Sequence, residues 1–203
     1  MKYLITGLGN IGDEYKNTRH NIGFIILDAW VREANVKFSD RRYGEVASLK
    51  YRGRTFVLLK PSTFVNRSGN AVNYWLRNEK IPEENLLVLV DDLSIPFGSM
   101  RLRSKGGDGG HNGLAHISMI LGHHSYSRLR FGIGSDFMTG GKVNYVLGEL
   151  TQEEEKVLNT KLDLAIDIIK SFGTIGIELT MTKYNKLAKS PDDEQERDNR
   201  PED

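Results

Sequence analysis

The sequence predicts a single α/β domain in which a twisted, mixed β-sheet is sandwiched between α-helices. Short apolar runs typical of buried strands alternate with longer segments that carry apolar residues at helical spacing. Two of these runs, residues 43–51 and 55–61, are separated only by "RGR", which is typical of an antiparallel hairpin. A hairpin inside an otherwise alternating pattern predicts a mixed sheet rather than a purely parallel one.

The individual elements follow from apolar spacing, taken in chain order. Residues 2–6 predict a buried first strand, residues 22–34 a helix, and residues 36–38 a short extended piece before the hairpin. Residues 66–79 have helical spacing, and the apolar run at 85–92 predicts a central strand. A strand at 99–103, a glycine-rich loop, a helix at 112–121 and a strand at 129–134 follow. Thr151 and Glu154 then form the capping box of a last long helix.

Length and charge divide the chain into a body and a tail. The 203 residues suffice for one sizeable core, which we expect to occupy residues 1–187. Residues 191–203 hold seven acids and two arginines, which is a net charge of −5. Because the whole chain has a net charge of +1, residues 1–190 carry +6. We expect residues 188–203 to be a disordered acidic tail. The basic body is compatible with a polyanionic partner.

Composition also limits compartment and chemistry. The chain has no cysteine, which excludes disulfides and thiolate metal sites and fits a reducing compartment. Its longest apolar run is "LLVLV", too short to span a bilayer, and the N-terminus lacks the pattern of a signal peptide. We therefore expect a cytoplasmic protein without a membrane segment.

Gly7, Gly9 and Gly12 have the spacing of the dinucleotide-binding fingerprint. That site requires a helix to begin within the glycine turn, because the helix N-terminal amides hold the pyrophosphate. Here nine polar or aromatic residues follow Gly12, and helical spacing resumes only at Ile22. The pattern therefore disfavours a nicotinamide enzyme and predicts a tight turn that brings Asn10 to the sheet edge.

Polar side chains follow the ends of three predicted strands. They are Asn10, Asn66 and the pair Asp91 and Asp92, while His20 lies in a polar loop. A histidine beside a carboxylate can activate water, because the carboxylate fixes the imidazole tautomer while the other ring nitrogen accepts a proton. The alternatives are a solvated surface histidine, a turn cap and Asx or helix caps. No G-x-S-x-G or H-E-x-x-H motif is present, and we expect no metal.

The stretch "SKGGDGGHNG" is either a flexible connector or a lid that lets the backbone approach a substrate. Arg101 and Arg103 alternate along one predicted strand and so share a face, as do Arg128 and Arg130 on another. These pairs predict either a solvated face or a phosphate-binding strip.

Five motifs in this order resemble those of the bacterial-type peptidyl-tRNA hydrolases: "GLGNIGDEYKNTRHNIG", "KPSTFVNRSGNAV", "VDDLSIPFG", "GGDGGHNGL" and "RLRFGIG". The resemblance runs over residues 2–185. It implies an α/β esterase that cleaves the bond between a peptide and the terminal ribose of its tRNA. It further implies a monomer that needs no cofactor, metal or obligatory protein partner.

The resemblance assigns roles to individual positions. His20 is similar to the family's catalytic base and Asp91 to its orienting acid. The substrate-binding positions are Asn10, Asn66 and Asn112, with Tyr15 and His111 in support, and the contacts to the tRNA backbone are Arg101, Arg103, Arg130 and Lys142.

Three positions depart from the family pattern, namely Ile11, Val65 and Ser94, where a proline, a methionine and an acid are usual. Three sources of oxyanion stabilisation stay open: the amide of Asn10, the amide of Asn66, or a backbone N–H of the glycine loop. A non-enzymatic RNA-binding module on the same fold is the main rival to the esterase.

Overall fold

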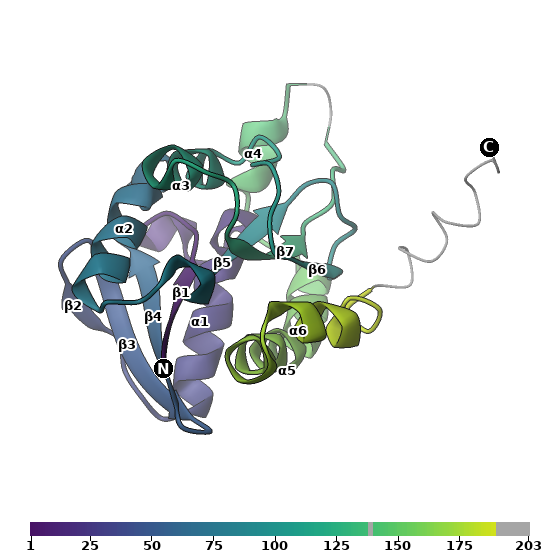
Figure 1. Cartoon of the computed structure of the whole chain (residues 1–203). Helices are drawn as coiled ribbons and strands as arrows, with labels where there is room; N and C mark the ends of the chain where they lie inside the picture. The colour runs from purple at the N-terminus through teal and green to yellow at the C-terminus, as the bar shows by residue number, and fades with distance from the viewer. Residues whose placement is uncertain (138–139, 190–203) are drawn as a thin grey trace, which may run out of the picture.

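One mixed β-sheet of seven strands organises the part of the chain that the computed structural model describes, residues 1–137 and 140–189. The strand order across the sheet is β2-β3-β4-β1-β5-β7-β6 (Figure 1). The strands are β1 (Lys2–Gly7), β2 (Ser39–Arg41), β3 (Gly44–Tyr51), β4 (Arg54–Pro61), β5 (Leu86–Asp92), β6 (Met100–Arg103) and β7 (Ser127–Gly132). The helices are α1 (Ile22–Glu33), α2 (Ser68–Asn78), α3 (Asn112–Leu121), α4 (Lys142–Val146), α5 (Gln152–Ile175) and α6 (Ile177–Tyr184).

Strand direction places the carboxyl ends of four central strands at one edge. β1 is parallel to β4 and β5, and β7 is parallel to β5. The outer strands are antiparallel to their neighbours, and Tyr51 pairs with Arg54 across the predicted hairpin. The mixed sheet expected from the sequence is confirmed, and the loops after β1, β4 and β5 meet at the same edge.

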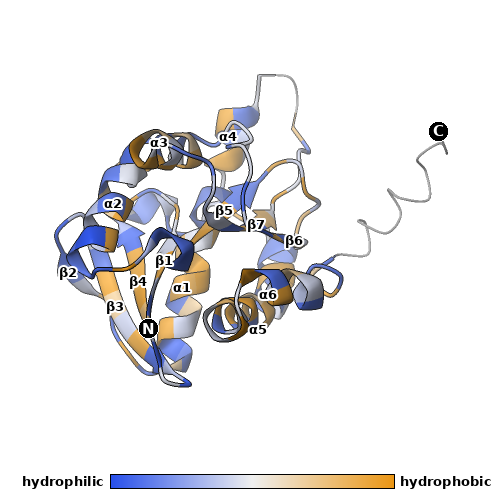
Figure 2. Ribbon diagram, viewed as in Figure 1, coloured by the Kyte–Doolittle hydropathy of each residue, from blue (hydrophilic) through white to orange (hydrophobic). Residues whose placement is uncertain are grey.

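Helices cover both faces of the sheet, because strand residues alternate between two apolar clusters. On β1, Tyr3 and Ile5 pack with α1 and α5, whereas Leu4 packs on the opposite side with α2 and α3. Figure 2 shows the apolar residues along the strands and on the helices against them. No helix in the described ranges has the length and apolar character needed to cross a lipid bilayer.

Two glycines bring the end of β1 against the start of α1. A β-carbon at Gly7 would lie 2.4 Å from the carbonyl oxygen of Gly23, and one at Gly23 would lie 2.6 Å from the amide nitrogen of Leu8. Only glycine permits this approach. Because α1 begins at Ile22, ten residues after Gly12, the glycine turn does not open a helix as a dinucleotide site requires.

Some elements differ from the expectations. Strand β2 lies at Ser39–Arg41 instead of 36–38, and α4 and α6 were not predicted. The three residues of β2 are all exposed and polar, so no apolar alternation marks the strand. The expected strand at 129–134 is β7, which begins two residues earlier and ends at Gly132. The capping box of α5 is confirmed.

The expected tail lies almost wholly outside the described residues, which end at 189. Ala188, at its predicted start, is buried, and its carbonyl oxygen accepts a hydrogen bond of 2.6 Å from the Met100 amide. The domain boundary and the disorder of the tail stay predictions.

Candidate active site

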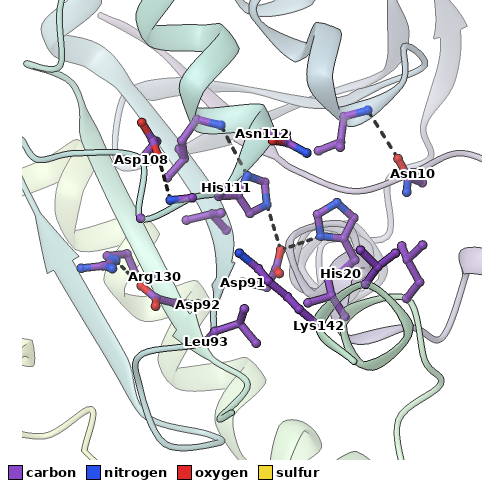
Figure 3. Close-up of a pocket in the computed structure, with 18 residues that line it drawn as sticks. Asn10, His20, Asp91, Asp92, Leu93, Asp108, His111, Asn112, Arg130 and Lys142 are labelled. Carbon is purple, nitrogen blue, oxygen red and sulfur yellow. Dashed lines mark hydrogen bonds and ion pairs between the residues drawn. The ribbon is translucent and has the colours of Figure 1, made fainter. Parts of the chain in front are cut away.

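A cleft of about 230 Å³ opens where the carboxyl ends of the central strands meet. Its walls come from the segments after β1 and β5, the segment between β4 and α2, the glycine loop before α3, and α4 (Figure 3). The lining includes Asn10, His20, Val65, Asp91, Asp92, Asp108, His111, Asn112, Arg130 and Lys142. Segments far apart in the sequence therefore form one site, as the topology of a largely parallel sheet predicts.

The centre of the cleft holds His20 and Asp91, whose side chains form a buried pair. His20 lies in the 3-10 helix η2 (Arg19–Asn21) that leads into α1, and Asp91 is near the end of β5. The imidazole Nδ1 is 3.0 Å from the carboxylate Oδ1, and the two residues are 7% and 6% exposed. Since a carboxylate can only accept, Nδ1 carries the proton and Nε2 keeps a lone pair. This is the tautomer that a general base requires.

His111 is a second imidazole on the same carboxylate oxygen, with Nε2 at 3.1 Å from Asp91 Oδ1 (Figure 3). Its Nδ1 accepts the backbone N–H groups of Gly113 and Leu114 and so caps the N-terminus of α3. An atom that accepts cannot also carry a proton, so the proton of His111 is on Nε2, which donates to Asp91. The two imidazoles have ring centroids 5.1 Å apart.

The charge of Asp91 is stabilised by these two neighbours. Burial alone raises the pKa of the carboxyl group, but the nearby imidazoles of His111 and His20 oppose this through charge and hydrogen bonds, and the net result is a pKa below the usual value. The carboxylate therefore stays ionised throughout the neutral range. A buried, ionised acid beside a base is common at catalytic sites.

Asn10 is held at the cleft wall by Asn21, a residue that the sequence analysis missed. Asn21 Oδ1 accepts the backbone N–H of Asn10 at 2.8 Å, and Asn21 Nδ2 donates to the Asn10 carbonyl at 2.9 Å. Asn10 Oδ1 accepts the Val65 amide at 3.4 Å, which orients the side chain. Its Nδ2 has no hydrogen-bond partner within the described ranges and stays available to a ligand. The only signal for Asn21 in the sequence is its place in the motif "GLGNIGDEYKNTRHNIG".

The expectation that Arg128 shares a solvent-facing or phosphate-binding face with Arg130 is wrong. Arg128 is only 1% exposed and cannot form part of such a strip. Its guanidinium donates to the carbonyl oxygens of Gly107 at 2.9 Å and His124 at 3.0 Å and lies 4.1 Å from the centre of the Tyr126 ring. The glycine loop passes over this side chain. Arg128 therefore ties the loop to β7.

The remaining cationic residues lie on β6, β7 and α4, and of these Arg130 and Lys142 line the cleft, whereas Arg101 and Arg103 do not. Arg101 and Arg130 are directly paired across β6 and β7, so they share a sheet face with Arg103. Arg130 forms an ion pair with Asp92, and the Lys142 Nζ lies against the glycine loop, 3.3 Å from the position of a Gly110 β-carbon. Partial burial and the charges of Arg101 and Arg130 lower the pKa of Arg103. Such mutual repulsion favours an anionic ligand.

The structure gathers most but not all of the residues named from the sequence. Asn112 lines the cleft, but Asn66 and Tyr15 do not. Asn66 is exposed in the 3-10 helix η3 (Val65–Arg67), and Tyr15 is half-buried in η1 (Asp13–Tyr15).

Two of the departures from the family pattern contact the site. Val65 lines the cleft, and Ser94 donates to Asp92 Oδ1 through both its backbone N–H and its hydroxyl. Ile11 is 51% exposed.

The donor chemistry does not fit a resident metal ion. His20, Asp91 and His111 offer ligand atoms within 4.8 Å of one another. A metal at His111 Nε2 needs a lone pair there, but the two backbone donors on Nδ1 keep the proton on Nε2. Likewise, His20 Nδ1 carries the proton that it donates to Asp91. The three side chains thus form a hydrogen-bonded set.

Comparison with known proteins gives one answer. The family model for peptidyl-tRNA hydrolase matches residues 4–193. The peptidyl-tRNA hydrolase of Phocaeicola vulgatus is 58% identical over 186 residues, which are 92% of this chain and all of that protein. That of Porphyromonas gingivalis is 51% identical over 91% of this chain and all of its own.

A solved structure gives the same result. The crystal structure of peptidyl-tRNA hydrolase from Acinetobacter baumannii superposes with a TM-score of 0.84 at 31% identity, over 90% of this chain and 94% of that one. On sequence and on structure, this chain belongs to the peptidyl-tRNA hydrolase family.

Proposed function

We propose that this protein hydrolyses the ester bond between a peptide and the 3′-terminal ribose of tRNA, which recycles tRNA released prematurely from ribosomes. The observation that carries the mechanism is the contact of 3.0 Å between His20 Nδ1 and Asp91 Oδ1 inside the cleft. Membership of the family supports the substrate. The reaction is a direct attack of water on the ester carbonyl.

His20 acts as the general base. Its Nε2 removes a proton from the attacking water, and the resulting imidazolium is stabilised by the ionised Asp91. His111 supports this arrangement, because its fixed Nε2–H holds the carboxylate oxygen that also accepts from His20. Proton transfer by a positioned base contributes about 10²–10⁴-fold to the rate.

Asn10 and two backbone amides of the glycine loop are the oxyanion donors that the geometry leaves among the three sources left open by the sequence. Asn66 does not line the cleft. The glycine-loop amides of Gly110 and His111 donate to Asp108, and those of Gly113 and Leu114 donate to His111. Asn10 Nδ2 has no such internal acceptor in the described part of the chain, and the same holds for the backbone amides of Gly109 and Asn112, which also line the cleft. Asn112, Asn66 and Tyr15 remain proposed contacts to the substrate.

Arg101, Arg103, Arg130 and Lys142 bind the phosphate backbone of the tRNA. Their support is the sheet face that the three arginines share, the place of Arg130 and Lys142 in the lining of the cleft, and the lowered pKa of Arg103. Phosphate contacts position an RNA without reading its sequence. We further propose a cytoplasmic monomer that needs no cofactor or obligatory protein partner.

The test is incubation of the purified protein with N-acetylaminoacyl-tRNA, followed by separation of free tRNA from ester. We expect release of tRNA. Binding of tRNA without cleavage would contradict the proposal and favour the RNA-binding module. A thermal shift on addition of a nicotinamide cofactor would favour the oxidoreductase, and we expect none.

A further inference from the structure

A second hollow, of about 500 Å³, lies between α2 and the turn that joins β2 to β3. Its lining is chemically uniform, with two arginines, two tyrosines and three asparagines and no carboxylate or aliphatic side chain. The residues are Arg42, Tyr43, Asn70, Asn73, Tyr74, Arg77 and Asn78. We call this hollow the α2 groove.

The α2 side of the groove is one stripe of the helix. Asn70, Asn73, Tyr74 and Arg77 follow at spacings of three and four residues, which places them on one face. The opposite face of α2, including Val72 and Trp75, is buried in the core. A stripe of amides, an aromatic ring and a cation is therefore presented to the groove.

The two arginines lack an internal counter-ion. In the described ranges neither Arg42 nor Arg77 has a carboxylate within ion-pairing distance, whereas Lys2, Arg19, Lys60 and Lys170 each have one. Arg42 is nevertheless held in place, because its Cζ lies 5.2 Å from the ring centres of both Tyr43 and Tyr74. An organised cation without a partner fits an anionic ligand.

The turn that carries Arg42 and Tyr43 is fixed against α2. Arg41 pairs with Gly44, so the turn has two residues, and Tyr43 adopts φ 67, in the region that favours glycine. The indole N–H of Trp75 donates to the Arg42 carbonyl at 3.0 Å. The turn and α2 therefore form a fixed wall of the groove.

We infer that the α2 groove binds a short segment of single-stranded RNA. Tyrosine rings stack on bases, arginines contact phosphates, and amides pair with base edges, which is the combination that such segments require. The choice of RNA as the anion rests on the function proposed above. The Ser62 amide donates to the Tyr43 carbonyl, and Val65, three residues further on, lines the catalytic cleft. The loop that follows β4 therefore reaches from the α2 groove to the cleft.

The two tryptophans provide a direct test. The Trp75 indole N–H is at the groove, while Trp30 packs in the apolar cluster on the other face of the sheet. In a ¹H–¹⁵N titration with a single-stranded RNA hexamer, we expect the Trp75 indole resonance to move saturably and that of Trp30 to stay. A stationary Trp75 resonance, or a Trp75 shift with an uncharged hexapeptide and none with RNA, would overturn the inference.

Arg52 supplies the matched control. Like Arg42 it is an exposed arginine in a two-residue hairpin turn beside a tyrosine, with Cζ 5.3 Å from the Tyr51 ring centre, but it lines neither the catalytic cleft nor the α2 groove. We expect Arg42→Gln and Arg77→Gln to weaken hexamer binding and each to lower its salt slope by about 0.7, and Tyr74→Leu to weaken binding at least about fivefold. Arg52→Gln should leave both unchanged.

Equal affinity and salt slope for Arg42→Gln, Arg77→Gln and Arg52→Gln would refute the site. Hydrolysis of peptidyl-tRNA by the unmutated protein is measured separately. Hydrolysis together with a stationary Trp75 resonance would reject the α2 groove and leave the proposed function intact. A Trp75 shift without hydrolysis would support the α2 groove and reject the proposed function.

Discussion

Asp91→Asn separates the charge of the carboxylate from its geometry. The carboxylate Oδ1 accepts both imidazole N–H groups, and the amide oxygen of asparagine can accept the same two. The substitution therefore keeps the His20 tautomer and removes the negative charge that stabilises the imidazolium. With charge centres about 4 Å apart and an effective dielectric constant of about 20, the lost interaction is roughly 4 kcal/mol. This corresponds to a decrease of about 10³-fold in kcat.

The assay is hydrolysis of N-acetylaminoacyl-tRNA, with kcat and KM measured separately and the fold checked by thermal unfolding. Asp28→Asn is the control, because it removes a carboxylate that pairs with Lys60 and does not line the cleft. We expect near-normal kcat for Asp28→Asn. If Asp91→Asn kept kcat within about fivefold of the unmutated protein, stabilisation of the imidazolium by Asp91 would be refuted.

Further predictions concern the surroundings of this pair. His111→Asn should keep the cap of α3 but lose the donor to Asp91. We therefore expect a free energy of unfolding in urea within about 1 kcal/mol of that of the unmutated protein and a kcat lowered about tenfold. A larger decrease in the free energy of unfolding together with an unchanged kcat would contradict this. Arg128→Met should lower the free energy of unfolding by roughly 2–3 kcal/mol and speed amide exchange in the glycine loop, and unchanged exchange would refute its tethering role. Arg130→Ala should lower the salt slope of tRNA binding by about 0.7–0.9, whereas an unchanged slope would place Arg130 off the RNA path. The folded pKa of Asp91 is below the unfolded value of about 3.9, so its ionised form stabilises the fold above that pH and loses this effect as the pH falls below it. The stability difference between the unmutated protein and Asp91→Asn should therefore shrink below about pH 4, and a difference that persisted there would contradict the assigned shift.

The sheet and its catalytic edge could be predicted because they depend on local pattern. Apolar runs located the central strands, and the rule for parallel strands brought the segments after β1, β4 and β5 together. The polar strand β2 and the five-residue α4 have no comparable pattern, since neither buries a regular apolar face.

The contacts that refine the site are long-range, which is why sequence patterns missed them. Alternation along β7 correctly gave Arg128 and Arg130 the same face, but it could not reveal that the glycine loop covers Arg128. Similarly, His111 was known only as a supporting residue. Its fixed tautomer depends on the start of α3 and on Asp91, twenty residues earlier in the chain.

Single-turnover hydrolysis by the His20→Ala variant, with and without added imidazole, measures whether the His20 imidazole removes the proton from water. If His20 is the general base, the variant should lose about 10²–10⁴-fold in the rate constant, bind tRNA as before, and partly recover as imidazole occupies the space beside Asp91. A His20→Ala rate constant within tenfold of the unmutated protein would contradict this role.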